Sequence, residues 1–131
     1  MNPAAVFDPT MLEMDPETQR FHRESGMPQV PFSSQARGFF NGAYSKENPE
    51  SGKPSVREAY GSELNWGRLE RAMKLAQKIG CTSNQIALAY LMSQPFQCFP
   101  IVGGRSAAQL KDSCAAAAIH LSPDQVRFLQ G

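Results

Sequence analysis

The feature that most constrains this sequence is a junction near its C-terminal end, where an apolar run meets two glycines and then a helix start. Residues 98–102 are a short apolar run between turn signals, which is typical of a buried parallel strand. Gly103 and Gly104 then turn the chain, and the segment 106–109 (Ser-Ala-Ala-Gln) has the pattern of a capping box that opens a helix. The junction therefore predicts a strand–turn–helix unit of an α/β fold.

A second strand is expected at residues 27–33, where Val30 and Phe32 stand among prolines. Pro28 and Pro31 each lack a donor for a sheet ladder, which weakens this prediction for a central strand. Residues 1–14 form an extended leading segment without apolar periodicity, and residues 41–63 form a long loop rich in glycine and proline. Loops of that length within compact domains are usually functional or mobile.

Helix signals fill the rest of the chain. Asp15 as N-cap with Pro16 at the first helical position predicts a helix that ends at Gly26. Capping boxes beginning at Thr82 and Ser122 open two more helices, of which the first is apolar on all sides over 86–92. A further helix ends at Gly80 and carries a stripe predicted to be buried, namely Leu69, Ala72, Met73, Ala76 and Ile79. This order predicts an α/β fold with parallel strands.

Composition limits the class of protein. A length of 131 residues leaves room for one domain, and a formal net charge of +1 gives no electrostatic footprint for nucleic acid or a membrane surface. The longest apolar run is too short to cross a bilayer, and the N-terminus lacks the pattern of a secretory signal. Three cysteines without a CxxC pair favour a reducing, cytoplasmic location over a disulfide framework or a zinc site.

Two segments carry candidate chemistry. Gly103, Gly104 and Arg105 precede a helix N-terminus, where free backbone donors and a guanidinium suit a phosphate. A plain turn with a solvated arginine remains the alternative, and local physics alone favours it. The segment 32–38 leaves the other predicted strand and would lie at the same sheet edge, although Phe32 could equally be a core residue. His22 and His120 lack partners at metal-ligand spacing, so no metal site is expected.

Taken together, three segments resemble the aldo-keto reductase family. Residues 26–40 (Gly-Met-Pro-Gln-Val-Pro-Phe-Ser-Ser-Gln-Ala-Arg-Gly-Phe-Phe) resemble its seventh barrel strand and the following loop, and residues 83–91 resemble its seventh helix. Residues 100–106 (Pro-Ile-Val-Gly-Gly-Arg-Ser) with Gln109 resemble its eighth strand and NADP-binding loop. The resemblance implies part of a TIM (β/α)8 barrel, with its last two parallel strands and their helices as one unit over 1–131.

The resemblance also implies a set of cofactor contacts. Phe32 would stack on the nicotinamide of NADP(H), and the chain from Ser33 to Gly38 would line the pyrophosphate. Gly103, Gly104 and Arg105 would hold the adenosine 2′-phosphate. Asp112 and Ser113 match positions that contact the adenine, with Ser113 standing where the family commonly has Asn. The full expected set is Phe32, Ser33, Ser34, Gln35, Arg37, Gly38, Gly103, Gly104, Arg105, Gln109, Asp112 and Ser113.

No residue aligns with the family's catalytic Asp, Tyr, Lys and His, which lie in earlier strands, and a full barrel needs roughly 250 residues. The resemblance thus implies the cofactor-binding C-terminal part of an NADP-dependent reductase, inactive alone, whose partners are NADPH and either the rest of the barrel or a second copy. The alternative is a non-catalytic module that packs against another protein through an open sheet.

Overall fold

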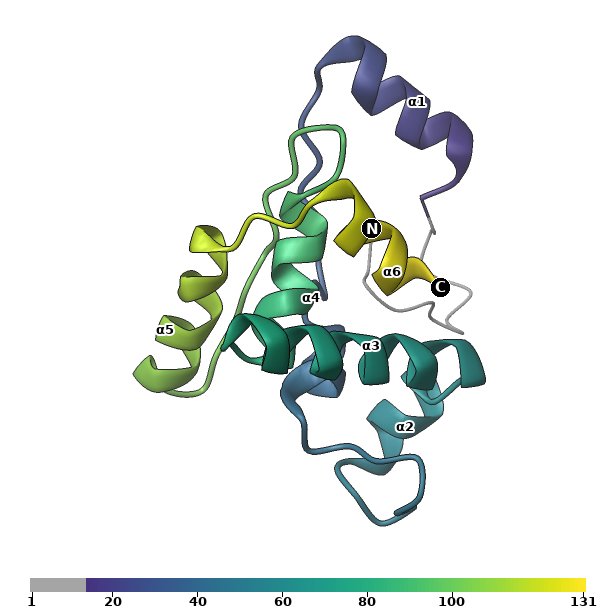
Figure 1. Cartoon of the computed structure of the whole chain (residues 1–131), viewed down its shortest axis with the longest axis vertical. Coiled ribbons are helices and arrows are strands. Elements are labelled where there is room, and N and C mark those ends of the chain that lie inside the picture. The colour runs from purple at the N-terminus through teal and green to yellow at the C-terminus, as the bar shows by residue number, and fades with distance from the viewer. Residues whose placement is uncertain (1–13) are drawn as a thin grey trace.

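The computed structural model describes residues 14–131, so the expected leading segment 1–14 lies outside the described residues except for its last one. Two crossing helices form the centre, and shorter helices surround them (Figure 1). The elements are α1 (Pro16–Ser25), the 3-10 segment η1 (Ala36–Asn41), α2 (Pro54–Tyr60), α3 (Glu63–Ile79), α4 (Ser83–Met92), α5 (Ala107–Ala115), the 3-10 turn η2 (Ala116–Ala118) and α6 (Pro123–Gln130).

The helix α4 is enclosed by its neighbours, as its apolar sequence predicts. Ile86 and Leu91 are fully buried, and α3, α5, η1 and η2 all pack around the helix. Thr82 and Gln85 form the expected capping box, in which each side chain bonds the other residue's backbone amide. A local signal at its start and an all-apolar surface were sufficient to place this helix.

The helix α3 begins earlier than its apolar pattern indicates and buries part of the expected stripe, namely Leu69, Ala72 and Ala76. Ser62 caps it and Gly80 ends it in a left-handed conformation. Trp66 and Leu75 are buried, whereas Met73 and Ile79 are 48% and 41% exposed. The expected stripe was therefore wrong at Met73 and Ile79, because the helix turns its Trp66 side toward the core.

The predicted parallel sheet is the main error, because residues 14–131 contain no β-strand. The two expected strands do lie side by side in parallel, but they meet only in an isolated bridge between Gln29 and Cys98. The Gln29 amide donates to Gln97 O at 2.8 Å, and Phe99 and Ile101 donate to Gln29 O and Pro31 O. The next ladder bond would need an N–H on Pro31, which proline lacks. The expectation of a partial barrel with two parallel strands is corrected accordingly.

The expected loop at 41–63 is also partly wrong, since α2 occupies its second half. Pro54 sits at the first turn of α2, and Val56 and Tyr60 bury one side of the helix. Arg57 lies 5.1 Å over the Trp66 ring and donates to the carbonyl oxygens of Ser45 and Asn48, which holds the remaining loop against α3. A helix as short as α2 is marginally stable in isolation, so these packing contacts stabilise it.

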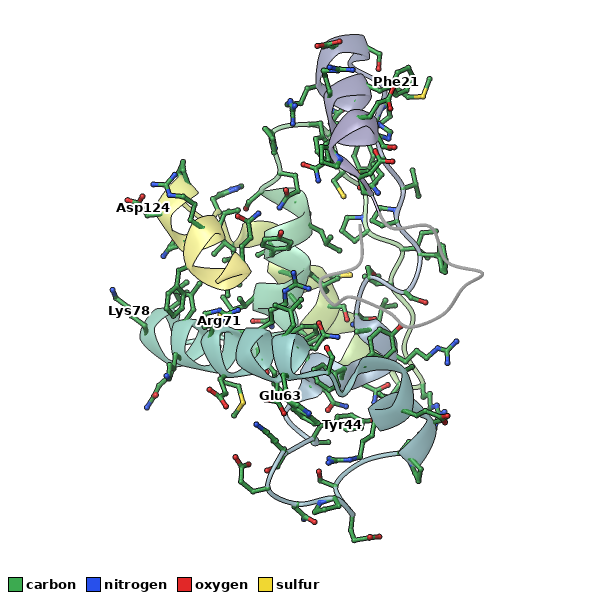
Figure 2. The ribbon with its side chains drawn as sticks, turned by 90° about the vertical axis from the view of Figure 1, so that its right-hand side faces the viewer. Phe21, Tyr44, Glu63, Arg71, Lys78 and Asp124 are labelled. Atoms are coloured by element: carbon green, nitrogen blue, oxygen red, sulfur yellow. The ribbon has the colours of Figure 1, made fainter. Side chains whose placement is uncertain are left out.

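Helices α1 and α6 differ in how closely they pack against the rest of the protein. The helix α1 has the expected Asp15 cap and Gly26 end but no buried residue, and it stands away from the body (Figure 1). The helix α6 buries Leu129 against the core, and Arg71 of α3 reaches its last carbonyls at 3.4 Å (Figure 2). No helix in residues 14–131 has the length and apolar character needed to span a bilayer.

Candidate functional site

Two loops converge at the end of the parallel segments. The first runs from Ser33 to Gly38, and the second runs from Gly103 to the start of α5. The Ile101 amide donates to Pro31 O at 3.0 Å, and the hydroxyl of the fully buried Ser34 donates to Ile101 O. These bonds bring together two segments that lie far apart in the sequence and fix where both loops begin.

The first loop has an unusual backbone. Ser33, Ala36 and Arg37 have φ values of 49°, 48° and 52°, and Gly38 follows at 88°. Non-glycine residues rarely adopt this left-handed region, where the side chain crowds the backbone. Short bonds from the Ala36 amide to Ser33 O and from the Gly38 amide to Gln35 O hold the turns, both at 2.8 Å. Such strained segments are concentrated at functional sites, so this one merits a functional interpretation.

The second loop approaches α5 closely. A Cβ at Gly104 would lie 3.2 Å from Gln109 Cβ and 3.3 Å from the Leu110 amide nitrogen, so glycine permits this approach. Ser106 caps α5 by accepting from the Gln109 amide. The Gln109 side chain does not complete the expected capping box. Its Oε1 instead accepts from the Arg105 amide at 2.8 Å, which fixes the loop beside the helix N-terminus.

Several of the expected contact residues remain available to a ligand. Phe32 is 57% exposed, so it is not a core residue. Arg37 and Arg105 are exposed, and within residues 14–131 their guanidinium groups form no ion pair or side-chain hydrogen bond. A Cβ added at Gly103 would meet no atom within 4 Å, so its backbone faces open space. An exposed ring, two unengaged cations and a helix N-terminus are a donor set that fits a flat ring system bearing phosphates.

Other expected contacts already have partners within the protein. Gln35 Nε2 donates to Ser113 Oγ at 2.7 Å and to Asn84 Oδ1 at 3.3 Å. Ser113 is 5% exposed and donates in turn to Gln109 O at 3.0 Å. The side chain of Gln35 therefore links the first loop to α4 and α5.

Asp112 is engaged by three side chains at the start of α4. Its carboxylate accepts from Gln85 Nε2 at 2.8 Å, from Asn84 Nδ2 at 3.1 Å and from Thr82 Oγ1 at 3.2 Å. Sequence reasoning identified the capping box at Thr82 but not its tie to α5, nor the part played by Asn84. The polar first turn at residues 83–85, ahead of an apolar segment, was the available signal.

No acid–base machinery is evident in the described part of the chain. Tyr60 is fully buried, Tyr44 OH accepts from the Lys53 amide, and Tyr90 OH accepts from Gln130 Nε2. Burial raises the pKa of the Cys81 thiol and Asp112 adds to that rise, while burial alone raises the pKa of Cys98. Neither thiol is activated. Residues 14–131 bring together no group of metal-ligating side chains.

Comparison with known proteins identifies the family of this chain. The family model for the Aldo/keto reductase family matches residues 9–131. The chain therefore belongs to the aldo/keto reductase family, and the proposed resemblance is confirmed.

Individual relatives carry reductase and dehydrogenase names. The chain is 28% identical over 112 residues to the versiconal hemiacetal acetate reductase of Aspergillus parasiticus, matching 82% of this chain and 32% of that protein. A putative aryl-alcohol dehydrogenase of Saccharomyces cerevisiae is 31% identical over 113 residues, matching 82% of this chain and 74% of that protein. Among the solved structures, a thermostable aldo-keto reductase in complex with the inhibitor epalrestat superposes with a TM-score of 0.64 at 18% identity, over 97% of this chain and 37% of its own.

The match in length is partial. The chain spans 32% of the Aspergillus reductase, 37% of the solved reductase, and 39% and 30% of two further putative aryl-alcohol dehydrogenases of Saccharomyces cerevisiae. The shared fold is thus one portion of a longer reductase chain.

Proposed function

We propose that this chain is the cofactor-binding part of an aldo-keto reductase and that it binds NADP(H) between its two loops. The observation that carries the proposal is that Phe32, Arg37 and Arg105 are all exposed, in two segments that hydrogen bonds hold side by side. Membership of the family supports a nicotinamide dinucleotide as the ligand. In an intact enzyme NADPH supplies a hydride to a carbonyl carbon.

Each free group has a task in this proposal. The ring of Phe32 stacks on the nicotinamide. Backbone groups of the Ser33–Gly38 segment and the guanidinium of Arg37 face the pyrophosphate, and Arg105 at the start of α5 binds the 2′-phosphate. Gln109 contributes indirectly by holding the Arg105 amide at 2.8 Å.

The test is a titration of the purified chain with NADPH and NADH. A charge-assisted contact to the 2′-phosphate is worth about 1.5–3 kcal/mol, so NADPH should bind about tenfold or more tightly than NADH. Arg105→Ala should remove this preference. Arg23→Ala is the matched control, because Arg23 is exposed on the detached helix α1 and should leave the preference intact. Equal affinity for the two cofactors in the unaltered protein would contradict the assignment.

The chain alone is expected to have no turnover. General acid catalysis typically contributes 10²–10⁴-fold, and each tyrosine has a structural role in the fold. We expect no NADPH-dependent reduction of a simple aldehyde above the rate in buffer, measured as loss of NADPH absorbance. Reduction that scales with the concentration of pure chain would show that catalytic residues lie within it.

A second candidate function is a non-catalytic interaction module, which one specific observation favours. Val30, Phe32, Phe99 and Ile101 are 57%, 57%, 54% and 54% exposed on one side of the two parallel segments. We call these four residues the apolar face. A second polypeptide, either the rest of a reductase or another copy of this chain, would cover it. Phe99→Lys should weaken binding to a second polypeptide and leave cofactor binding intact, and this result would separate the second function from the first.

A further inference from the structure

One polar relay connects the two loops of the proposed site, and it begins at Asp112. Asn84 Nδ2 donates to Asp112 Oδ2 at 3.1 Å, while Asn84 Oδ1 accepts from Gln35 Nε2 at 3.3 Å. Gln35 Nε2 also donates to Ser113 Oγ at 2.7 Å, and Ser113 donates to Gln109 O at 3.0 Å. Because Gln109 Oε1 holds the Arg105 amide, the relay runs without a gap from the first loop to the second.

The orientation of the Asn84 amide group, and with it the bond from Gln35 to Asn84, depends on Asp112. A carboxylate only accepts hydrogen bonds, so the amide group of Asn84 must turn its NH₂ toward Asp112 and its oxygen toward Gln35. Gln35 can then donate to Asn84 and to Ser113. Gln85 Nε2 must keep facing residue 112, because Gln85 Oε1 accepts from the Thr82 amide. An Asn at 112 would therefore turn its oxygen to Gln85 and its NH₂ to Asn84, so Asn84 would have to reverse and its NH₂ would face the NH₂ of Gln35.

The position of Asp112 strengthens this role. Its carboxylate bonds three side chains, those of Thr82, Asn84 and Gln85, at the N-terminal turn of α4. A negative charge is favourable there because the first amides of a helix carry partial positive charge. Asn84 is 7% exposed and Ser113 is 5% exposed, whereas Asp112 and Gln35 are half-buried. A mismatched donor at the buried Asn84 is therefore costly.

We infer that Asp112 is a positioning residue that orients the Asn84–Gln35–Ser113 relay and thereby holds the first loop against the second. This inference rests on the proposed function only where it assigns NADP(H) binding to the two loops. It differs from the contact to adenine that the family resemblance implies, since the carboxylate faces α4 and its bonds are made within the protein.

The experiment measures amide hydrogen exchange of Ala36 and Gly38 in the free protein by NMR. Both amides donate within the first loop at 2.8 Å, so their exchange reports its order. Asp112→Asn keeps the shape of the side chain but introduces a donor, and we expect exchange at these two amides to become about tenfold faster. Asp124→Asn on α6 is the control, because it also removes one carboxylate charge but lies on a different helix.

The double variant D112N/N84D provides a stricter test. It exchanges donor and acceptor across the same contact, so the relay regains its polarity and a carboxylate stays in the first turn of α4. We expect exchange at Ala36 and Gly38 to return to within about threefold of the unaltered protein. NADPH affinity should follow the same order among the variants.

The outcomes separate this inference from the proposed function. Unchanged exchange in D112N, or a double variant as fast as the single one, would overturn the positioning role. Weaker NADPH binding with unchanged exchange would instead make Asp112 a direct ligand, which also overturns it. Failure of the unaltered protein to bind NADPH would overturn the proposed function alone, because the exchange data still decide the relay. If D112N unfolds, the same comparison is made on the double variant, whose failure to fold would count against the inference.

Discussion

At the scale of single residues, the fold gives the three cysteines different reactivities. Cys114 is exposed on α5, whereas Cys98 is 8% exposed beside the parallel bridge and Cys81 is half-buried at the end of α3. Burial raises the pKa of Cys98 and of Cys81 above the ordinary 9.0, with the charge of Asp112 raising Cys81 further. A raised pKa leaves less thiolate at any given pH, and thiolate is the reactive form.

We therefore expect an alkylating reagent at pH 8 to label Cys114 first and Cys81 and Cys98 later. Labelling at Cys81 and Cys98 should keep accelerating as the pH rises through 9, since their thiolate fractions are still increasing there. Peptide mass spectrometry measures the three sites separately, and unfolded protein, in which burial is removed, is the control. Early labelling of Cys98 would contradict the burial and the raised pKa.

Single residues also show which parts of the candidate site can be predicted from the sequence. Gly103, Gly104 and Arg105 could be found because a glycine turn before a helix start is a local pattern. The exposure of Phe32 and the lack of an ion pair at Arg37 could not be predicted, because both depend on tertiary packing around these residues. The tie between Asp112 and the start of α4 joins residues 27 to 30 positions apart, and no local spacing encodes it.

At the scale of elements, helices with a strong start were predictable and strands were not. The caps at Asp15, Thr82 and Ser122 place helix starts because the bonds involved lie within one turn. The helix α2 lacks such a side-chain cap and owes its place to Val56, Tyr60 and the Arg57–Trp66 contact. For the strands, the apolar character of the two segments favoured a sheet, whereas their prolines opposed it. At Pro31 the missing N–H prevents the next ladder bond.

This explanation of the missing strands can be tested by Pro31→Val. The substitution supplies an N–H opposite Phe99 O, in the register set by the bond from the Gln29 amide to Gln97 O. We expect the new amide to be protected from exchange at least about tenfold relative to an exposed amide, since one ladder bond is added. Stability should change little, because the loss of proline rigidity in the unfolded chain offsets the new bond.

Pro28→Val is the matched control for this substitution. Successive amides of an extended segment point to opposite sides, and position 28 is one residue out of step with the bonded Gln29. Its new amide should therefore exchange rapidly. A rapidly exchanging amide at position 31 would show that something other than the missing donor prevents strand formation.

At the scale of the whole molecule, the buried core and the apolar face lie on different sides of the two parallel segments. Phe39 of η1, Tyr60 of α2 and Trp66 of α3 pack together as the aromatic centre of the core. Helix α3 crosses α4 beside this centre (Figure 1). The bridge alternates its side chains, so Cys98 and Pro31 are buried toward this body, whereas Phe99 and Ile101 point away from it. The chain spans about a third of the length of several relatives.

We expect the purified chain to self-associate through the apolar face as its concentration rises. At ~25 cal/mol per Å², covering a few hundred Å² of apolar surface is worth on the order of several kcal/mol, comparable with the stability of a domain of this size. Sedimentation velocity over a range of concentrations measures the association. Phe99→Lys with Ile101→Lys should shift the protein toward monomer without unfolding it, because both side chains are more than half exposed, at 54% each.

Phe21→Lys with Phe128→Lys is the control pair for this last prediction. These side chains are 50% and 44% exposed, and they lie on α1 and α6 rather than on the two parallel segments. The two substitutions remove a similar apolar area outside the apolar face, so association should persist in this double variant. A monodisperse monomer at every concentration, with a sharp cooperative unfolding transition, would mean that the apolar face is stable in water and needs no partner. Association abolished by the control pair instead would move the contact to another surface.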